Sequence, residues 1–268
     1  MDIMRINNLN FSYEKKQVIS DFSLNIEAGK WVSIVGPNSS GKSTLVRILA
    51  CLIKTPCNID IDGIRLDERT VMKIRSKMGF IFDNPDNMFI GETVKDDIAF
   101  GLENTKVPRA EIEKRISHVA KLLDIENLLE CDPHRLSGGE KQKVALASAL
   151  VMNVKILILD DALSMINPYE KKEILSILKT LHDTTDITLI TVTSDLEEVL
   201  YSDHLVVMNY GVKVIEGNTL DVLKLEKIFI DLEMKLPFMV DFSLKLKDYS
   251  LVDDVILDMK ELVNRLWL

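Results

Sequence analysis

The sequence predicts an α/β fold with a mostly parallel core sheet. Short apolar runs typical of strands alternate with stretches of helical periodicity, and this alternation favours parallel strands joined by helices. The pattern turns mostly helical in one long internal stretch and again towards the C-terminus. We therefore expect an α/β domain over residues 1–218, with a helical subdomain inserted at about 84–153, and a C-terminal helical extension over residues 219–268.

The expected strands follow one another along the chain. The first apolar run, KWVSIVG, precedes a helix that begins near Gly41, and the later runs are KILILDD, ITLITVT, HLVVMNYG and KVIEG. Between the first two runs lies EIEKRISHVAKLLDIENLL, whose apolar residues recur at helical spacing. They are Ile112, Ile116, Val119, Leu122 and Leu123. This stretch predicts a helix of the inserted subdomain.

The last segment, SLVDDVILDMKELVNRLWL, predicts a closing helix. Ser250 and Asp253 have the spacing of a capping box, which marks a helix N-terminus. One face of this helix would be apolar. The residues on that face are Val255, Met259, Leu262, Val263 and Leu266. We therefore expect the helix to begin at Ser250.

Composition and charge exclude several classes of protein. Lys and Arg number 33 against 42 Asp and Glu, a formal net charge of −9. We therefore expect no broad surface for nucleic acid, although a local basic patch stays open.

Cys51, Cys57 and Cys131 form no CxxC pair, which is typical of free thiols in a reducing compartment. The N-terminal stretch MDIMRINNLNFSYEKK lacks the apolar region of a secretory signal, and no run reaches the ~18 apolar residues that a spanning helix needs. We expect a soluble chain, and docking on a membrane protein stays open.

The stretch GPNSSGKST, from Gly36 to Thr44, matches the pattern G-x-x-x-x-G-K-[ST] between an expected strand and an expected helix. Glycines allow the backbone to wrap around phosphates, and the N–H groups of a helix N-terminus attract them. In this motif Lys42 reaches the β- and γ-phosphates and Ser43 binds Mg²⁺. A glycine-rich structural turn is the alternative, and the flanking strand and helix argue against it.

In KILILDD, Asp160 lies at the end of an expected buried strand, where a carboxylate can hold Mg²⁺ in the Walker-B role. On its own, a strand-end aspartate is as often an ordinary turn residue. Because Asp160 follows a phosphate-binding loop in the same chain, we assign it to the metal. Together the two motifs indicate a P-loop nucleoside triphosphatase.

The segment RLSGGEKQKVALASAL resembles the signature motif of ABC-type ATPases. Ser137 and the two glycines after it would leave a helix N-terminus open to a phosphate. The resemblance implies that Ser137, Gly138, Gly139 and Glu140 contact the ATP held by the opposite subunit of a dimer. It also implies an N-terminal antiparallel β region beside the mostly parallel core sheet.

The stretch GFIFDNPDNMFIGETVKDDIAFGLEN resembles most closely the ATPases of energy-coupling factor transporters, which import vitamins and metal ions. LEMKLPFMVDFSLKLK and the closing ELVNRLW are similar to the C-terminal extension of those ATPases, so the resemblance covers nearly the whole chain. It implies that Tyr13 stacks on adenine, although an aromatic in a strand is about as often a core residue. The residues expected at ATP are Tyr13, Gly36, Pro37, Asn38, Ser39, Ser40, Gly41, Lys42, Ser43 and Thr44.

Four positions depart from the family pattern, and the resemblance links each of them to hydrolysis. Asp83 replaces a glutamine; it would still bind Mg²⁺ but adds negative charge near the γ-phosphate. Asp161 replaces the glutamate that polarises the attacking water, and misplacing a catalytic group by ~1 Å lowers a rate about a hundredfold. Asn167 replaces an aspartate that communicates across the dimer, and Ser194 replaces a histidine that contacts the γ-phosphate.

No other histidine is an evident substitute for the one missing at position 194. We expect surface or helix-cap positions for His118, His134, His182 and His204. The chain should therefore bind ATP and Mg²⁺ but hydrolyse ATP slowly, while its signature segment is intact. This asymmetry predicts a heterodimer with a second ABC ATPase at the cytoplasmic face of the cell membrane. The resemblance adds a transmembrane coupling protein and a substrate-binding membrane protein as partners.

Two other functions stay open. One is a non-catalytic, nucleotide-binding regulatory or scaffold subunit, and the other is the ATPase of another type of ABC transporter. A soluble ABC ATPase of nucleic-acid repair or translation would show long coiled coils, duplicated cassettes or basic stripes, which this sequence lacks. The sequence does not name the transported substrate, because in this family a separate membrane protein recognises it.

Overall fold

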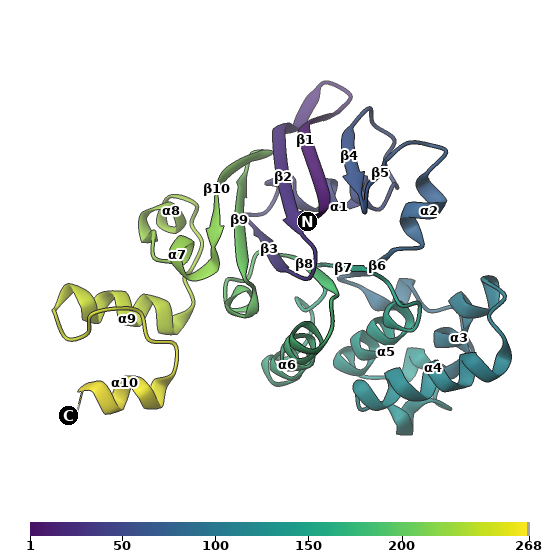
Figure 1. Ribbon diagram of the computed structural model, residues 1–268. Coiled ribbons are helices and arrows are strands. Elements are labelled where there is room, and N and C mark those ends of the chain that lie inside the picture. Colours follow the sequence, from purple (N-terminus) through teal and green to yellow (C-terminus); the bar gives the residue numbers. More distant parts are fainter. Residues whose placement is uncertain (267–268) are drawn as a thin grey trace.

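Two β-sheets lie at the centre of the computed structural model, which describes residues 1–266, and helices surround them (Figure 1). Trp267, in the tail motif ELVNRLW, and Leu268 lie outside the described residues. The predicted α/β fold with an antiparallel region beside a mostly parallel core sheet is confirmed.

The smaller sheet is antiparallel, with four strands in the order β2-β1-β4-β5. One of its faces is buried, through residues such as Met4, Ile6 and Phe22, which explains why buried and exposed residues alternate along β1. Its strands are β1 (Asp2–Tyr13), β2 (Lys16–Glu27), β4 (Asn58–Ile61) and β5 (Ile64–Arg65).

The larger sheet has six strands in the order β10-β9-β3-β8-β7-β6, and all neighbours are parallel except β9 and β10. Strands β3, β7 and β8 are buried along their whole length, as parallel strands with both faces covered must be. The strands are β3 (Trp31–Val35), β6 (Met78–Phe82), β7 (Ile156–Asp160), β8 (Thr188–Thr193), β9 (His204–Asn209) and β10 (Val212–Asn218).

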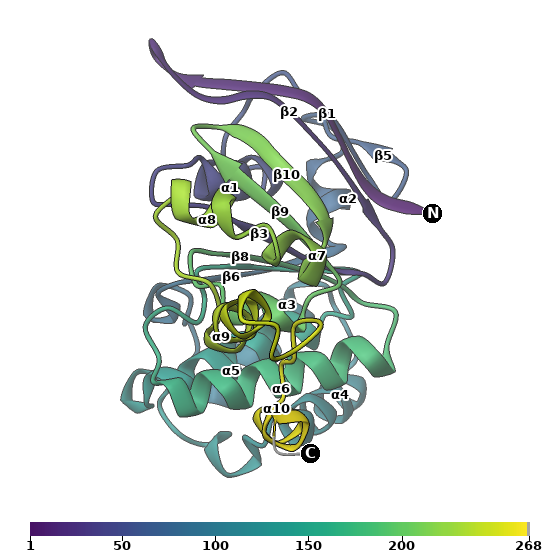
Figure 2. The ribbon, with the colours of Figure 1, turned by 90° about the vertical axis from the view of Figure 1, so that its left-hand side faces the viewer.

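Layers form on both faces of the core sheet, with the β1–β2 hairpin on one side and α5 and α6 on the other (Figure 2). Leu45, Val46 and Leu49 of α1 join the apolar core that includes the antiparallel sheet. Only helices and turns are described between β6 and β7. The helices from the N-terminus to this region are α1 (Lys42–Leu49), α2 (Val71–Arg75), η1 (Pro85–Asn87), α3 (Val94–Asn104), α4 (Arg109–Leu122), η2 (Glu126–Leu128), η3 (Pro133–Arg135) and α5 (Gly138–Leu150).

The helix predicted from EIEKRISHVAKLLDIENLL is α4, and its apolar face is buried through Ile112, Ile116 and Val119. The remaining helices follow β7. They are α6 (Pro168–Thr184), η4 (Glu198–Tyr201), α7 (Thr219–Leu223), α8 (Glu226–Asp231), α9 (Phe238–Asp248) and α10 (Met259–Leu266).

The prediction that the last helix begins at Ser250 is wrong. Ser250 has a left-handed backbone (φ 56°) and follows the end of α9, a conformation typical of helix termination. The last helix, α10, begins at Met259, and the Asp258 carboxylate accepts the backbone N–H of Glu261 at 2.8 Å. Val252 and Ile256, in the segment between the two helices, are buried in a small apolar cluster with Leu262. The apolar residues of this segment are therefore buried without forming a helix.

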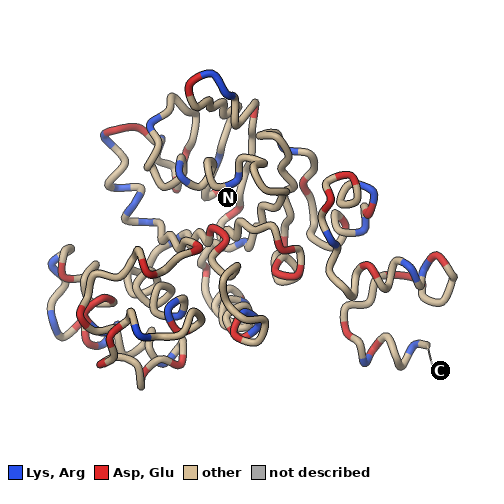
Figure 3. Tube along the Cα trace, turned by 180° about the vertical axis from the view of Figure 1, so that it is seen from behind, with Lys and Arg blue, Asp and Glu red and all other residues tan. Residues whose placement is uncertain are grey.

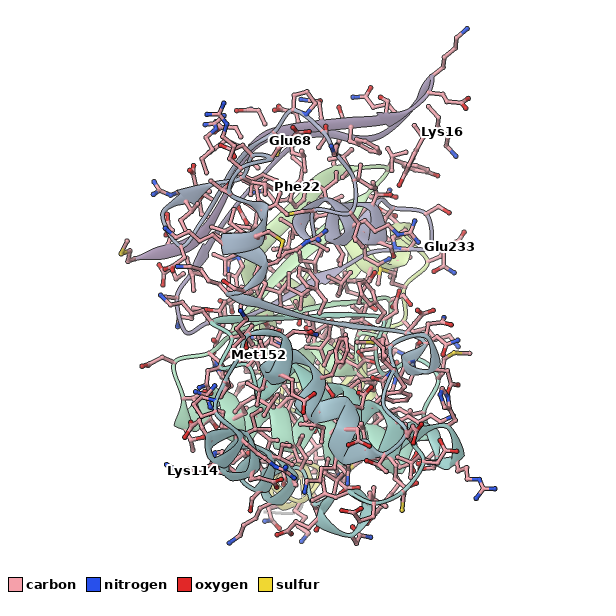
Figure 4. All side chains as sticks on the ribbon, turned by 90° about the vertical axis from the view of Figure 1, so that its right-hand side faces the viewer. Lys16, Phe22, Glu68, Lys114, Met152 and Glu233 are labelled. Carbon is pink, nitrogen blue, oxygen red and sulfur yellow. The ribbon has the colours of Figure 1, made fainter. Side chains whose placement is uncertain are left out.

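Charge is interspersed over the surface. Lys and Arg lie among Asp and Glu over most of the trace (Figure 3). Figure 4 shows Lys16 and Glu68 at the end of the molecule that carries the antiparallel sheet, and Lys114 at the opposite, helical end. Among residues 1–266, no helix combines the length and apolar character needed to span a membrane.

Candidate functional site

The candidate site lies at one edge of the core sheet, where parallel strands end side by side. Gly36 follows β3, Ser194 follows β8, Asp160 ends β7 and Asp83 follows β6. These strands are neighbours in the order β3-β8-β7-β6. The sheet therefore brings together residues that are far apart in the sequence, at the edge where α/β proteins bind ligands.

The loop between β3 and α1 needs a residue without a side chain at one position and a left-handed backbone at two others. A Cβ atom at Gly36 would collide with the carbonyl oxygen of Met208. Ser39 and Gly41 both have positive φ, 65° and 104°. No side chain among the described residues caps the N-terminus of α1, so its first N–H groups stay available to an anion.

Lys42 is 5% exposed and folds back over this loop. Its Nζ donates to the carbonyl oxygens of Gly36 at 2.7 Å and Pro37 at 3.1 Å. Burial lowers the pKa of Lys42, and the nearby carboxylates of Asp161 and Asp160 oppose that shift. The loop thus holds a positive charge next to its open N–H groups, which suits a phosphate chain.

Asp160 and Ser43 form the polar end of the same site. Ser43 Oγ donates to Oδ1 of Asp160 at 3.4 Å. The pKa of Asp160 is raised to about 6. Burial is the largest cause, the negative charge of Asp161 is the second, and the charge of Asp83 adds to the shift. The Ser43 hydrogen bond and the charge of Arg47 oppose this rise in pKa without cancelling it.

These residues fit Mg²⁺ that arrives with a nucleotide. No group of three His, Cys, Asp or Glu side chains within residues 1–266 is arranged to hold a metal by itself. Mg²⁺ commonly takes only one or two protein ligands and completes its shell with phosphate oxygens and water. Ser43 and Asp160, with Asp83 nearby, match such a partial set, and a cation would relieve the repulsion between the carboxylates.

Asp161 and Ser194, two of the four positions that depart from the family pattern, are neighbours. Asp161 has a left-handed backbone (φ 47°), and its N–H donates to the carbonyl oxygen of Val192 at 2.8 Å. Burial raises the pKa of the Asp161 carboxyl, while the charge of Lys42 and a hydrogen bond from the backbone of Ser194 act in the opposite direction. The carboxylate is therefore held against the segment that follows β8.

A cavity of about 430 Å³ contains most of the residues expected at ATP. Its size is within the range of small-molecule sites. Tyr13 lines the cavity, is 43% exposed and packs edge-on against Phe11, so it is not a core residue. A larger hollow of about 870 Å³ lies beside α2 and contains none of the motif residues. The residues lining the smaller cavity are Tyr13, Lys16, Gln17, Val18, Asn38, Ser39, Ser40, Gly41, Lys42, Ser43, Thr44, Asp161 and Tyr210.

The signature segment forms the N-terminus of α5. Ser137 is its N-cap and shares a capping box with Glu140: Ser137 N–H donates to Glu140 Oε2 at 2.8 Å, and Glu140 N–H donates to Ser137 Oγ at 3.3 Å. Ser137 and Gly138 are exposed, whereas Gly139 is buried against α6. None of these residues lines the 430 Å³ cavity.

Known proteins share both the motifs and the fold. Residues 19–164 match the ABC transporter family. The chain is 40% identical to the energy-coupling factor transporter ATP-binding protein EcfA1 of Leuconostoc mesenteroides over 248 residues, 91% of each chain. It is 38% identical to EcfA1 of Bacillus subtilis, over 99% of this chain and 96% of that protein. The chain belongs to the energy-coupling factor transporter ATP-binding proteins.

A solved structure supports this membership. CbiO1 from Clostridium perfringens, described as part of the ABC transporter complex CbiONQ, has a TM-score of 0.79 to this chain at 33% identity. The likeness covers 88% of this chain and 96% of that one. The mixed arrangement of antiparallel and parallel sheets is therefore that of an ABC ATPase.

In this member of the ATP-binding proteins, the histidines lie away from the cavity. His118 and His134 are exposed, and His204 is half-buried with Nε2 3.7 Å from the Glu216 carboxylate. The expectation of a surface or cap position is wrong for His182, whose side chain is 8% exposed and packs edge-on against Trp31 with ring centres 6.0 Å apart. Among the described residues, no histidine lines the cavity.

Sequence patterns missed several residues of the site. Tyr210 and the hairpin residues Lys16, Gln17 and Val18 also line the cavity. Gln142, on α5, donates from Nε2 to the carbonyl oxygen of Phe82 at 3.2 Å and so links the signature helix to the loop that contains Asp83. The residues NYG between two strand runs predict a turn. The sequence does not show that this turn lies beside the phosphate loop, because that depends on the strand order.

Proposed function

We propose that this chain is the ATPase subunit that energises an energy-coupling factor importer of vitamins or metal ions, as one half of a heterodimer. Its own site binds ATP and Mg²⁺ and hydrolyses ATP slowly, and its signature segment completes the site of a second ABC ATPase. The names of its relatives support the transporter role. The complex that contains the structural relative supports membrane partners.

Binding of ATP is supported by the loop between β3 and α1. Lys42, the first N–H groups of α1 and Tyr13 line or border one cavity, where the lysine and the N–H groups would hold the phosphates and Tyr13 would contact the base. Ser43, Asp160 and Asp83 would hold Mg²⁺. The metal neutralises charge on the phosphate oxygens when it is bound.

The signature helix begins outside the cavity of its own chain, and this separation is the observation that carries the proposal. Ser137 and Gly138 are exposed at a helix N-terminus, a place that suits an anion. Because they do not line the cavity, we assign them to a nucleotide that another chain supplies. The intact signature segment therefore serves a partner subunit.

Slow hydrolysis is supported by the pair Asp161 and Ser194. Asp161 is one methylene shorter than the glutamate of the family, and its carboxyl lies close to the backbone of Ser194. A serine hydroxyl at position 194 is short and carries no positive charge. A homodimer would contain two such sites, so a heterodimer with a more active subunit is the better arrangement. Asn167, at the interface position, differs from the family residue as well.

The further partners are a transmembrane coupling protein and a membrane protein that recognises the substrate. The chain then works at the cytoplasmic face of the cell membrane, as a peripheral subunit. Closure of the ATPase pair around ATP would pass movement to the coupling protein.

Hydrolysis by the purified chain tests the proposal. We expect slow turnover by the unmodified chain and faster turnover by the double variant Asp161→Glu with Ser194→His. Lys42→Ala serves as the control that binds ATP weakly. Brisk hydrolysis by the unmodified chain, abolished by Lys42→Ala, would contradict the weakened site.

A regulatory subunit that uses ATP only for assembly is the second candidate, and the same Asp161 and Ser194 favour it. The two functions differ in the assembled complex. If Lys42→Ala in this chain leaves transport by the complex unchanged while weakening its assembly, the regulatory function is correct. Loss of transport from an intact complex supports the transporter-energising function.

A further inference from the structure

The turn between β9 and β10 has an unusual residue at its first position. Asn209 ends β9 and Val212 begins β10, so the loop has two residues, Tyr210 and Gly211. Both have positive φ, 45° and 79°, which corresponds to a type I′ turn. Asparagine, aspartate and glycine are preferred at the first position, and a bulky side chain is unfavourable there. Tyr210 is the only aromatic residue with positive φ in residues 1–266.

This turn is fixed to the phosphate-binding loop. The N–H of Gly211 donates to the carbonyl oxygen of Ser40 at 2.8 Å, and the N–H of Ser20 donates to the carbonyl oxygen of Gly211 at 3.0 Å. A Cβ atom at Gly211 would collide with the carbonyl oxygen of Val18. The turn is therefore held between β2 and the loop that begins at Gly36, so the position of Tyr210 is set by the same backbone that would hold the phosphates.

The ring of Tyr210 has almost no protein contacts although it lies at the cavity. The residue is 86% exposed and lines the 430 Å³ cavity together with Tyr13, which is 43% exposed. The two tyrosines come from different sheets, since Tyr13 ends β1 and Tyr210 follows β9. Figure 1 shows β9 and β10 beside the β1–β2 hairpin. Lys42 and Ser43 line the same cavity, so it has both an aromatic and a phosphate-binding part.

We propose that Tyr210 is a second aromatic contact for the nucleobase, so that the base of the bound nucleotide lies between Tyr13 and Tyr210. This inference rests on the proposed binding of ATP at the phosphate loop. Stacking on a base would cover the exposed ring, and aromatic stacking accepts any base because every base has a π-face. Tyr210 thus favours nucleotides over phosphate chains that lack a base. Its unfavourable place in the turn is explained by this contact.

The test compares two ligands on the purified full-length chain in the presence of Mg²⁺. ATP carries a base, and inorganic tripolyphosphate is the matched ligand without one. In Tyr210→Asn the turn receives the residue that its backbone prefers, while the ring is lost. Titration calorimetry should show ATP binding weakened about tenfold, tripolyphosphate binding unchanged, and the melting temperature unchanged or higher. Tyr210→Phe should bind ATP as the unmodified chain does.

Two controls separate the possible results. Tyr249→Asn replaces a tyrosine that is 79% exposed outside the cavity, and it should change neither ligand. Lys42→Ala should weaken both. Unchanged ATP binding by Tyr210→Asn, or an equal loss for both ligands, would overturn the base contact. If the unmodified chain binds neither ligand, the proposed function is wrong, and the proposed base contact is wrong as well.

Discussion

The carboxylate of Glu170, in the first turn of α6, lies directly against Gly139 at the N-terminus of the signature helix α5. A Cβ atom added at Gly139 would lie 2.5 Å from Cδ and 2.9 Å from Cβ of Glu170. Oε1 of Glu170 accepts a hydrogen bond from Ser137 Oγ at 3.3 Å, and Oε2 accepts one from Nδ2 of Asn167 at 2.6 Å. The close approach of the two helices therefore depends on glycine at position 139.

We expect Gly139→Ala to reduce the free energy of unfolding by about 1–3 kcal/mol, because the methyl group overpacks this contact. In a Glu170→Ala background the loss should be smaller, because the Cδ and Oε2 contacts are removed while the 2.9 Å contact with Cβ remains. Urea unfolding of the four proteins in the cycle measures the coupling. Equal effects of Gly139→Ala in both backgrounds would show that Glu170 is not the obstacle.

Asp160→Asn should stabilise the nucleotide-free chain at neutral pH. The pKa of Asp160 is raised to about 6, mainly by burial and by the charge of Asp161. A carboxyl with a raised pKa destabilises the folded chain when it is charged, so the penalty is full above pH 6 and disappears as the pH falls towards 4. We expect Asp160→Asn to be more stable than the unmodified chain by about 2 kcal/mol at pH 7.5, with no difference near pH 4.

The control for this prediction is the ligand. Saturating ATP with Mg²⁺ should raise the melting temperature of the unmodified chain and have a smaller effect on Asp160→Asn, since a ligand stabilises only the state that binds it. A stability difference that stays constant between pH 4 and 7.5 would show that the charge of Asp160 is not its cause.

Local patterns predicted the parts of this protein that depend on short stretches of sequence. The apolar runs at β3, β7 and β8 and the motif from Gly36 to Thr44 needed no tertiary information. The place of Tyr210 was not predictable in this way, because it depends on β9 pairing with β3 and on the contact between Gly211 and Ser40. Glu170 was missed for a similar reason, since its contact with Gly139 joins two helices.

Ser250 shows the opposite error, in which a local pattern was trusted too far. The capping-box spacing from Ser250 to Asp253 is real, but Ser250 follows α9 with a left-handed backbone. The segment after it is held by packing, with Val252 and Ile256 in an apolar cluster, and by the hydrogen bond that the N–H of Ile256 donates to Ser243 Oγ at 3.1 Å. Tertiary contacts thus override the local preference for a helix.

Lys171 joins α6 to the segment that follows Ser194, and its loss should be strongly destabilising. Its Nζ lies 2.8 Å from Oδ2 of Asp195 and 2.7 Å from Oε1 of Glu198, and the Glu198 side chain is only 5% exposed. Burial raises the pKa of Glu198, and the bond from Lys171 limits that rise. In Lys171→Met the buried carboxylate loses its cationic partner, and we expect a loss of about 3 kcal/mol at pH 8.

The pH dependence identifies the cause of that loss. Without Lys171 the pKa of Glu198 should rise further, so the carboxylate takes up a proton as the pH falls, and the deficit of Lys171→Met should shrink between pH 8 and 5. Adding Glu198→Gln removes the charge and should restore most of the stability, with a deficit that no longer varies with pH. If the double variant is as unstable as Lys171→Met at pH 8, the buried charge is not responsible, and the packing of the lysine side chain against α6 and η4 is the cause instead.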